Sequence, residues 1–203
     1  MKLNPEDRGL QGLSTFVSLI LLNVLYLVLC VPIVTIGAAT TALYEVMIRF
    51  SDEESGRPLN DFLPAFARNF LRATALWLTC AIPLALLVIS AVFWLTSPST
   101  IGLAAALLSG LAAAYVFAAT LYAFALAATH VNTFRQTLKN AFLLPFAEPV
   151  RTLGIVLIPV TLVALSVIMP PFTIILATIG CSIGAYGTAF LLRGVFRRHQ
   201  PAA

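Results

Sequence analysis

Long uncharged stretches alternate with short polar segments along this chain, and their length is its most informative feature. A helix that crosses a bilayer needs about 20 apolar residues, and five stretches meet this requirement. They are residues 13–36, 73–96, 101–129, 152–169 and 172–192. Turn residues 97–100 and the pair Pro170-Pro171 separate neighbouring stretches. The pattern predicts an all-α integral membrane bundle of about five transmembrane helices, formed by residues 1–203 as a single domain.

Two of the connecting segments carry amphipathic patterns. Residues 59–71 and 132–147 place aromatic side chains on one face and polar ones on another, which predicts two cytoplasmic helices lying in the membrane interface. The cations predicted to contact lipid headgroups are Arg68, Arg72, Arg135 and Lys139. The succession of span, amphipathic helix and span occurs twice. It has two interpretations, a parallel internal repeat or two unrelated interfacial helices.

Composition agrees with a lipid-facing surface. Of the 203 residues, 60% are hydrophobic and 10% are charged, whereas a soluble domain carries about a quarter charged residues. The net charge of +4 comes from cations at the ends of apolar runs, so we expect no nucleic-acid partner. The lipid bilayer is the expected environment.

The placement of the cations predicts an orientation. Ten of the 12 Lys and Arg residues fall in the connections after spans one and three and in the C-terminal tail. They are Arg49, Arg57, Arg68, Arg72, Arg135, Lys139, Arg151, Arg193, Arg197 and Arg198. Lys2 and Arg8 lie in the N-terminal segment. The positive-inside rule then predicts a multi-pass protein of a bacterial inner membrane with its N-terminus outside and its C-terminus in the cytoplasm.

Residues for catalysis are sparse. The sequence has no phosphate-binding loop, no His-Glu-x-x-His and no Gly-x-Ser-x-Gly, and all eight acidic residues lie outside the five predicted spans. His130 sits at a span border, and Cys30, Cys80 and Cys181 lie in apolar stretches without metal-ligand spacing. We therefore expect no enzyme activity, no cofactor and no metal, and only a neutral cargo if the protein is a transporter.

The end of the first span combines helix-breaking and polar residues. Pro32 removes a backbone hydrogen bond, Gly37 permits a bend and close helix approach, and hydroxyls follow. The candidate functional segment consists of Asn23, Pro32, Thr35, Gly37, Thr40 and Tyr44. One interpretation is a kinked helix that lines a polar cavity or a subunit contact. The other is a structural kink that continues as an amphipathic helix to about Phe50. Further along, Asn69 is expected to cap span two, and the alternative is a polar cluster with Thr74.

Asn23 and residues 32–44 resemble the signature stretch of the YesL family, bacterial polytopic membrane proteins of unknown function. Residues 62–70, 137–141 and 151–153 are also similar to that family, so the resemblance covers nearly the whole chain. Members are typically encoded near sugar-binding proteins and permeases of ABC importers, which implies an accessory role in carbohydrate uptake. The family has no established site residues to transfer.

Three functional hypotheses follow. The first is a non-enzymatic accessory subunit that contacts permease subunits of a sugar ABC importer. The second is an autonomous transporter or channel for a neutral solute, which should have a polar cavity reached by Asn23 or Thr35. The third is a membrane scaffold that binds anionic lipid through its interfacial cations.

Overall fold

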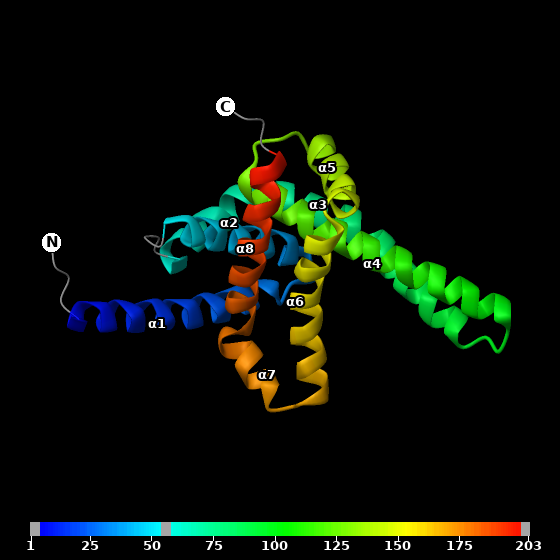
Figure 1. The fold of residues 1–203 in the computed structure, drawn as a ribbon, viewed down its shortest axis with the longest axis horizontal. Coiled ribbons are helices and arrows are strands. Elements are labelled where there is room, and N and C mark those ends of the chain that lie inside the picture. Colours follow the sequence, from blue (N-terminus) through cyan, green and yellow to red (C-terminus); the bar gives the residue numbers. More distant parts are fainter. Residues whose placement is uncertain (1–4, 54–57, 200–203) are drawn as a thin grey trace.

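The computed structural model describes residues 5–53 and 58–199, and every element among these residues is helical (Figure 1). In chain order the elements are α1 (Pro5–Cys30), η1 (Ile33–Thr35), α2 (Ile36–Glu53), α3 (Pro58–Leu95), α4 (Thr100–Thr129), α5 (Phe134–Ala147), α6 (Pro149–Ile168), α7 (Phe172–Ile175), η2 (Leu176–Gly180) and α8 (Cys181–His199). Lys2 and Arg57, two cations used for the orientation, lie outside the described residues. The predicted all-α helical bundle is confirmed.

Six helical segments among the described residues are long and apolar enough to cross a membrane, one more than the sequence predicted. The additional segment, Ile33–Ser51, contains η1 and most of α2. In the sequence its polar residues suggested an amphipathic continuation of span one. Most of α2 is instead buried by other helices, because its polar side chains find partners inside the protein.

Three boundaries differ from the predicted ones. The first span was expected to reach residue 36, but α1 ends at Cys30 because Pro32 has no N–H to extend it. The predicted interfacial helix 59–71 and span 73–96 form one 38-residue helix, α3, since no turn residue separates them. The last span contains a π-helix of five residues, η2, which the sequence did not predict.

The segment after α4 follows the prediction closely. Helix α5 falls within the expected range 132–147, and the Thr133 side chain caps it by accepting a hydrogen bond from the Gln136 N–H at 3.4 Å. Pro145 was expected to end this helix but lies inside it, and Pro149 begins α6, where a missing N–H costs nothing.

The buried part of the molecule surrounds α2. We call it the central core: α2, residues 58–80 of α3, residues 116–127 of α4, and α8. Helix α2 lies antiparallel to the first half of α3, since its start meets Ala73 and its Arg49 lies near Asp61. Helix α6 packs beside α8.

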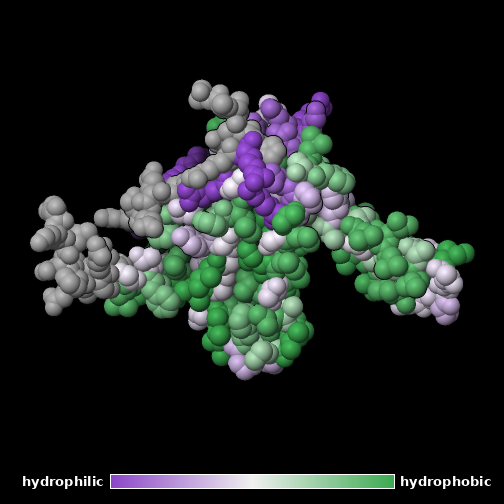
Figure 2. All heavy atoms as spheres, viewed as in Figure 1, coloured by the Kyte–Doolittle hydropathy of each residue, from purple (hydrophilic) through white to green (hydrophobic). Residues whose placement is uncertain are grey.

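Two parts extend away from this core in opposite directions, α1 and the end of the α3–α4 hairpin (Figure 1). We call residues 81–115 the distal hairpin. No residue of α3 beyond Cys80 is buried. Figure 2 shows that hydrophilic side chains gather around α5 and the C-terminal end of α8, whereas the distal hairpin and the lower parts of α6 and α7 are hydrophobic.

Candidate functional site

The break between α1 and α2 is closed by local hydrogen bonds. The Val31 N–H donates to the Val28 carbonyl at 3.2 Å, and the Thr35 N–H donates to the Pro32 carbonyl at 3.0 Å. The Thr35 hydroxyl approaches both the Leu29 carbonyl, at 2.5 Å, and the Pro32 carbonyl, at 2.7 Å. Thr35 therefore satisfies carbonyls that the proline break leaves without helical donors.

Gly37 is the point of closest approach between α2 and α3. A Cβ atom at this position would lie 2.6 Å from the Ala73 carbonyl oxygen and closer still to Trp77 Cβ. Because backbone blocks this space, only glycine fits without moving a helix. The Trp77 indole N–H also donates to the Ile33 carbonyl at 2.8 Å, which fixes the break against α3.

A carboxylate that the sequence did not single out lies at the centre of this contact. Glu45 is only 9% exposed. It accepts hydrogen bonds from Arg49 at 2.9 Å, from Arg68, and from the Asn69 amide at 2.8 Å. Asp61 lies 3.9 Å from Arg49 at the edge of the group. The cluster joins α2 to α3 through charge-assisted bonds.

Two sequence-based expectations are corrected by this cluster. Glu45 lies in a helix long and apolar enough to span a membrane, so not every acidic residue lies outside such helices. Asn69 lies inside α3 and donates to Glu45 and to the Ala65 carbonyl, so it does not cap a span. The i, i+4 spacing of Glu45 and Arg49 within an apolar stretch was the available sequence signal.

Asn23 connects α1 to the π-helix of the last span. Its side chain is fully buried, and its amide nitrogen lies 3.1 Å from the Leu176 carbonyl and 2.7 Å from the Ala177 carbonyl. Its amide oxygen accepts from the Ser182 N–H at 3.0 Å, and the Ser182 hydroxyl donates to the Leu19 carbonyl at 3.1 Å. The wide turn of η2 thus finds its hydrogen-bond partners on α1.

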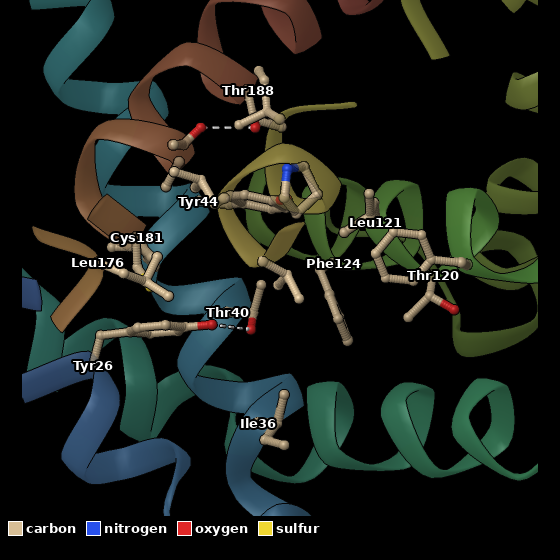
Figure 3. A pocket seen from close by; sticks show the side chains of 18 of the residues that line it. Tyr26, Ile36, Thr40, Tyr44, Thr120, Leu121, Phe124, Leu176, Cys181 and Thr188 are labelled. Atoms are coloured by element: carbon tan, nitrogen blue, oxygen red, sulfur yellow. Dashed lines mark hydrogen bonds between the residues drawn. The ribbon is translucent and has the colours of Figure 1, made fainter. Parts of the chain in front are cut away.

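A cavity of about 350 Å³ lies between α2, α4, α6 and the η2–α8 segment (Figure 3). Two residues of the candidate segment, Thr40 and Tyr44, line it. The Tyr26 hydroxyl, also in the wall, lies 3.2 Å from the Thr40 hydroxyl. Asn23 and Thr35 do not line the cavity, because each is used in the contacts described above.

The four cations predicted to contact lipid divide into two pairs. Arg68 binds Glu45, and Arg72 donates to the Thr137 hydroxyl at 2.7 Å and to the His130 carbonyl at 3.4 Å. Arg135 and Lys139 are exposed on α5. The structure therefore gives Arg68 and Arg72 structural partners, while a headgroup contact for Arg135 and Lys139 stays a prediction.

His130 ends α4 and contacts the Phe196 ring, with ring centroids 5.2 Å apart. Burial lowers the pKa of His130, because an imidazolium loses hydration there. The three cysteines are unpaired thiols. Within residues 5–53 and 58–199, no three His, Cys, Asp or Glu side chains gather as metal ligands would.

One family comparison matches part of the chain. Residues 19–91 match the model of a family described as Protein of unknown function, DUF624. That range contains the α1–α2 break, the Glu45 cluster and the Asn23 side of the contact with η2. No curated protein and no solved structure matches the chain.

Proposed function

We propose that this chain is a non-enzymatic accessory component of ABC-type carbohydrate uptake in the inner membrane of a bacterium. The proposal is based on the distal hairpin. This hairpin extends away from the central core and exposes apolar side chains. Among its most exposed residues are Phe93, Leu95, Leu107, Leu108 and Leu111. A hairpin that few helices of its own chain cover is suited to pack against the spans of a permease subunit.

A glycine in the hairpin supports a helix–helix contact there. A Cβ atom at Gly110 would meet nothing within 4 Å, so this glycine faces away from the chain's own helices. Membrane helices approach closely where small residues line the interface. The resemblance of residues 32–44 to the YesL family adds the link to sugar importers.

The proposed orientation places the N-terminus outside and the C-terminus in the cytoplasm, with five crossings. Helix α2 is not counted as a crossing because it pairs with residues 58–80 through Glu45. This half of α3 carries the charged residues of the helix. A reporter fused after Arg198 should be cytoplasmic and one before Lys2 external. Reporters on the same side would make α2 a sixth crossing and overturn this topology.

The cavity favours a second candidate, an autonomous transporter or channel for a neutral solute. None of its 19 lining residues is charged. Exposed Arg135 and Lys139 favour the third candidate, a scaffold that binds anionic lipid in a salt-dependent manner.

Purification in a mild detergent from a native host distinguishes these candidates. Stoichiometric recovery of permease or sugar-binding subunits, identified by mass spectrometry, is the expected result. A Gly110→Leu variant should lose these subunits while keeping its own yield, because that position is open. Recovery of the chain alone, from both preparations, would contradict the accessory role.

A further inference from the structure

The side chains that line the cavity determine which kind of ligand can bind in it. Five of the 19 lining residues carry hydroxyl groups, and the others are apolar apart from the Cys181 thiol. Four of these hydroxyls already have partners on their own or a neighbouring helix. Thr120 donates to the Val116 carbonyl and Thr188 to the Gly184 carbonyl, each at 2.8 Å, and Tyr26 lies beside Thr40. A sugar would have to give up its hydration for few hydrogen bonds in return.

The cavity opens sideways between α4 and α6. Phe117, Pro159 and Val163 line both the cavity and a shallower hollow of about 390 Å³ on the outer face of these helices. Val163 is 60% exposed at this opening. Both helices are apolar enough to span a membrane, so hydrocarbon surrounds the opening when they do.

We propose that this cavity binds one hydrocarbon chain, taken from the bilayer through the opening beside Val163. The inference goes beyond the proposed role in sugar uptake and does not depend on it. Hydrocarbon matches the apolar wall, and a volume of about 350 Å³ lies in the range of small-ligand sites. The chain belongs to a phospholipid or to a free fatty acid, which share this chemistry.

The π-helix positions one wall of the site. Leu176 and Cys181, at the two ends of η2, line the cavity. Asn23 lies behind them and binds the Leu176 carbonyl and the Ser182 N–H. Asn23 is therefore a positioning residue, and its loss should weaken chain binding without removing any side chain from the cavity wall.

Trp77 lines the cavity and provides an intrinsic probe. The sequence has two tryptophans, and Trp94 lies at the far end of α3. In a Trp94→Phe background, the purified protein in detergent is titrated with a phospholipid carrying dibrominated acyl chains. Bromine quenches tryptophan only at short range. We expect saturable quenching of Trp77 at a low mole fraction of lipid in the micelle.

Two matched variants test the opening. Val163→Phe narrows it and should raise the midpoint of quenching at least tenfold. Val167→Phe, one turn along the same exposed face of α6, should leave the midpoint unchanged. Quenching that rises in proportion to lipid, equally in all three proteins, would show general lipid contact only and overturn the proposal. Saturable quenching with equal midpoints would overturn the assigned opening.

A parallel titration with dibromostearic acid identifies the source of the chain. A lower midpoint for the fatty acid assigns the site to free fatty acid, and a lower midpoint for the phospholipid assigns it to a bilayer lipid. Both results support binding of a hydrocarbon chain. Absence of saturable quenching with either probe would contradict it. Copurification of permease subunits is a separate measurement. The accessory role and the binding of a hydrocarbon chain can therefore fail independently of each other.

Discussion

The central core carries charged residues and the distal hairpin carries none, and the two regions are held in different ways. In the core, Glu45 anchors α2 to Arg68 and Asn69 of α3, and Gly37 brings α2 into backbone contact with α3. In the hairpin, the one side-chain hydrogen bond that joins α3 and α4 there, among the described residues, runs between Ser90 and Ser109 at 3.1 Å. Buried polar groups specify the first region, and apolar packing is the main contact in the second.

The difference has a physical origin. Within lipid there is little hydrophobic force between helices, so polar contacts and close backbone approach decide which helices associate. The core has both, which fixes one arrangement. The hairpin has an open glycine and apolar side chains, which suits it to a partner from outside the chain.

The largest loss of stability is expected at the contact between the backbones of α2 and α3. Pro32→Ala combined with Gly37→Leu should disrupt the core, because the new side chain meets the Ala73 carbonyl. Overpacking costs roughly 1–3 kcal/mol and occasionally more, and we expect the upper end. Size-exclusion chromatography of the purified variant would show loss of the folded species. Gly110→Leu is the control and should give the folded species in the same yield as the parent. Equal behaviour of the two leucine variants would remove the contrast between core and hairpin.

A smaller loss of stability is expected when the Glu45 cluster is disrupted. Glu45→Leu leaves Arg68 and Asn69 without their acceptor, and an unmade buried hydrogen bond costs about 1–3 kcal/mol. The lower half of that range applies, since Arg68 is 59% exposed. Thermal unfolding in detergent measures the change. Asp61→Asn is the control, since Asp61 is only a distant partner of Arg49, and an equal drop in Tm for both variants would contradict the role given to Glu45.

A loss of stability similar to that of the Glu45 variant is expected at the contact between α1 and η2. Asn23→Leu removes the partners of two carbonyls and one N–H, each worth about 1 kcal/mol in net terms. We expect faster proteolysis near η2 and a lower Tm. Ser18→Ala removes only a local bond to the Ser14 carbonyl and should change neither. Unchanged proteolysis in the Asn23 variant would mean that α1 does not hold the last span.

The smallest expected effect is the pH dependence of stability that comes from His130. Burial lowers the pKa of His130 in the folded state, so the unfolded chain binds the proton more readily. The free energy of unfolding should therefore decrease as pH falls below about 6.5, the ordinary value for histidine. Thermal unfolding between pH 7 and pH 5 should show a shallower decrease for His130→Gln. Identical slopes for parent and variant would contradict this assignment.

The sequence predicted those features that depend on neighbouring residues. Pro32 and Gly37 predicted a kink near the end of the first span, the amphipathic pattern of residues 132–147 predicted α5, and the length of the apolar stretches gave the helical membrane architecture. The joining of the amphipathic segment to span two was missed, because periodicity changes at residue 72 while the backbone hydrogen bonds continue.

The polar contacts of the candidate site were harder to predict. Asn23 and Ala177 are 154 residues apart, and no local pattern indicates that a π-helix will need an amide from α1. Glu45 was only placed outside the predicted spans, and its burial was not predicted because its partners Arg68 and Asn69 lie on another helix. Thr40 and Tyr44 line the cavity, whereas Asn23 and Thr35, one of which an autonomous transporter was expected to place in such a cavity, make contacts elsewhere.

The most direct test of the central claim places a photoreactive amino acid at Leu108, on the exposed side of the distal hairpin. The same group at Ile168, an exposed position of α6, is the control. After irradiation of native membranes, we expect position 108 to give a protein adduct that contains a permease subunit. Position 168 should give lipid adducts alone. Lipid adducts alone from both positions would contradict the claim that the hairpin is a docking surface.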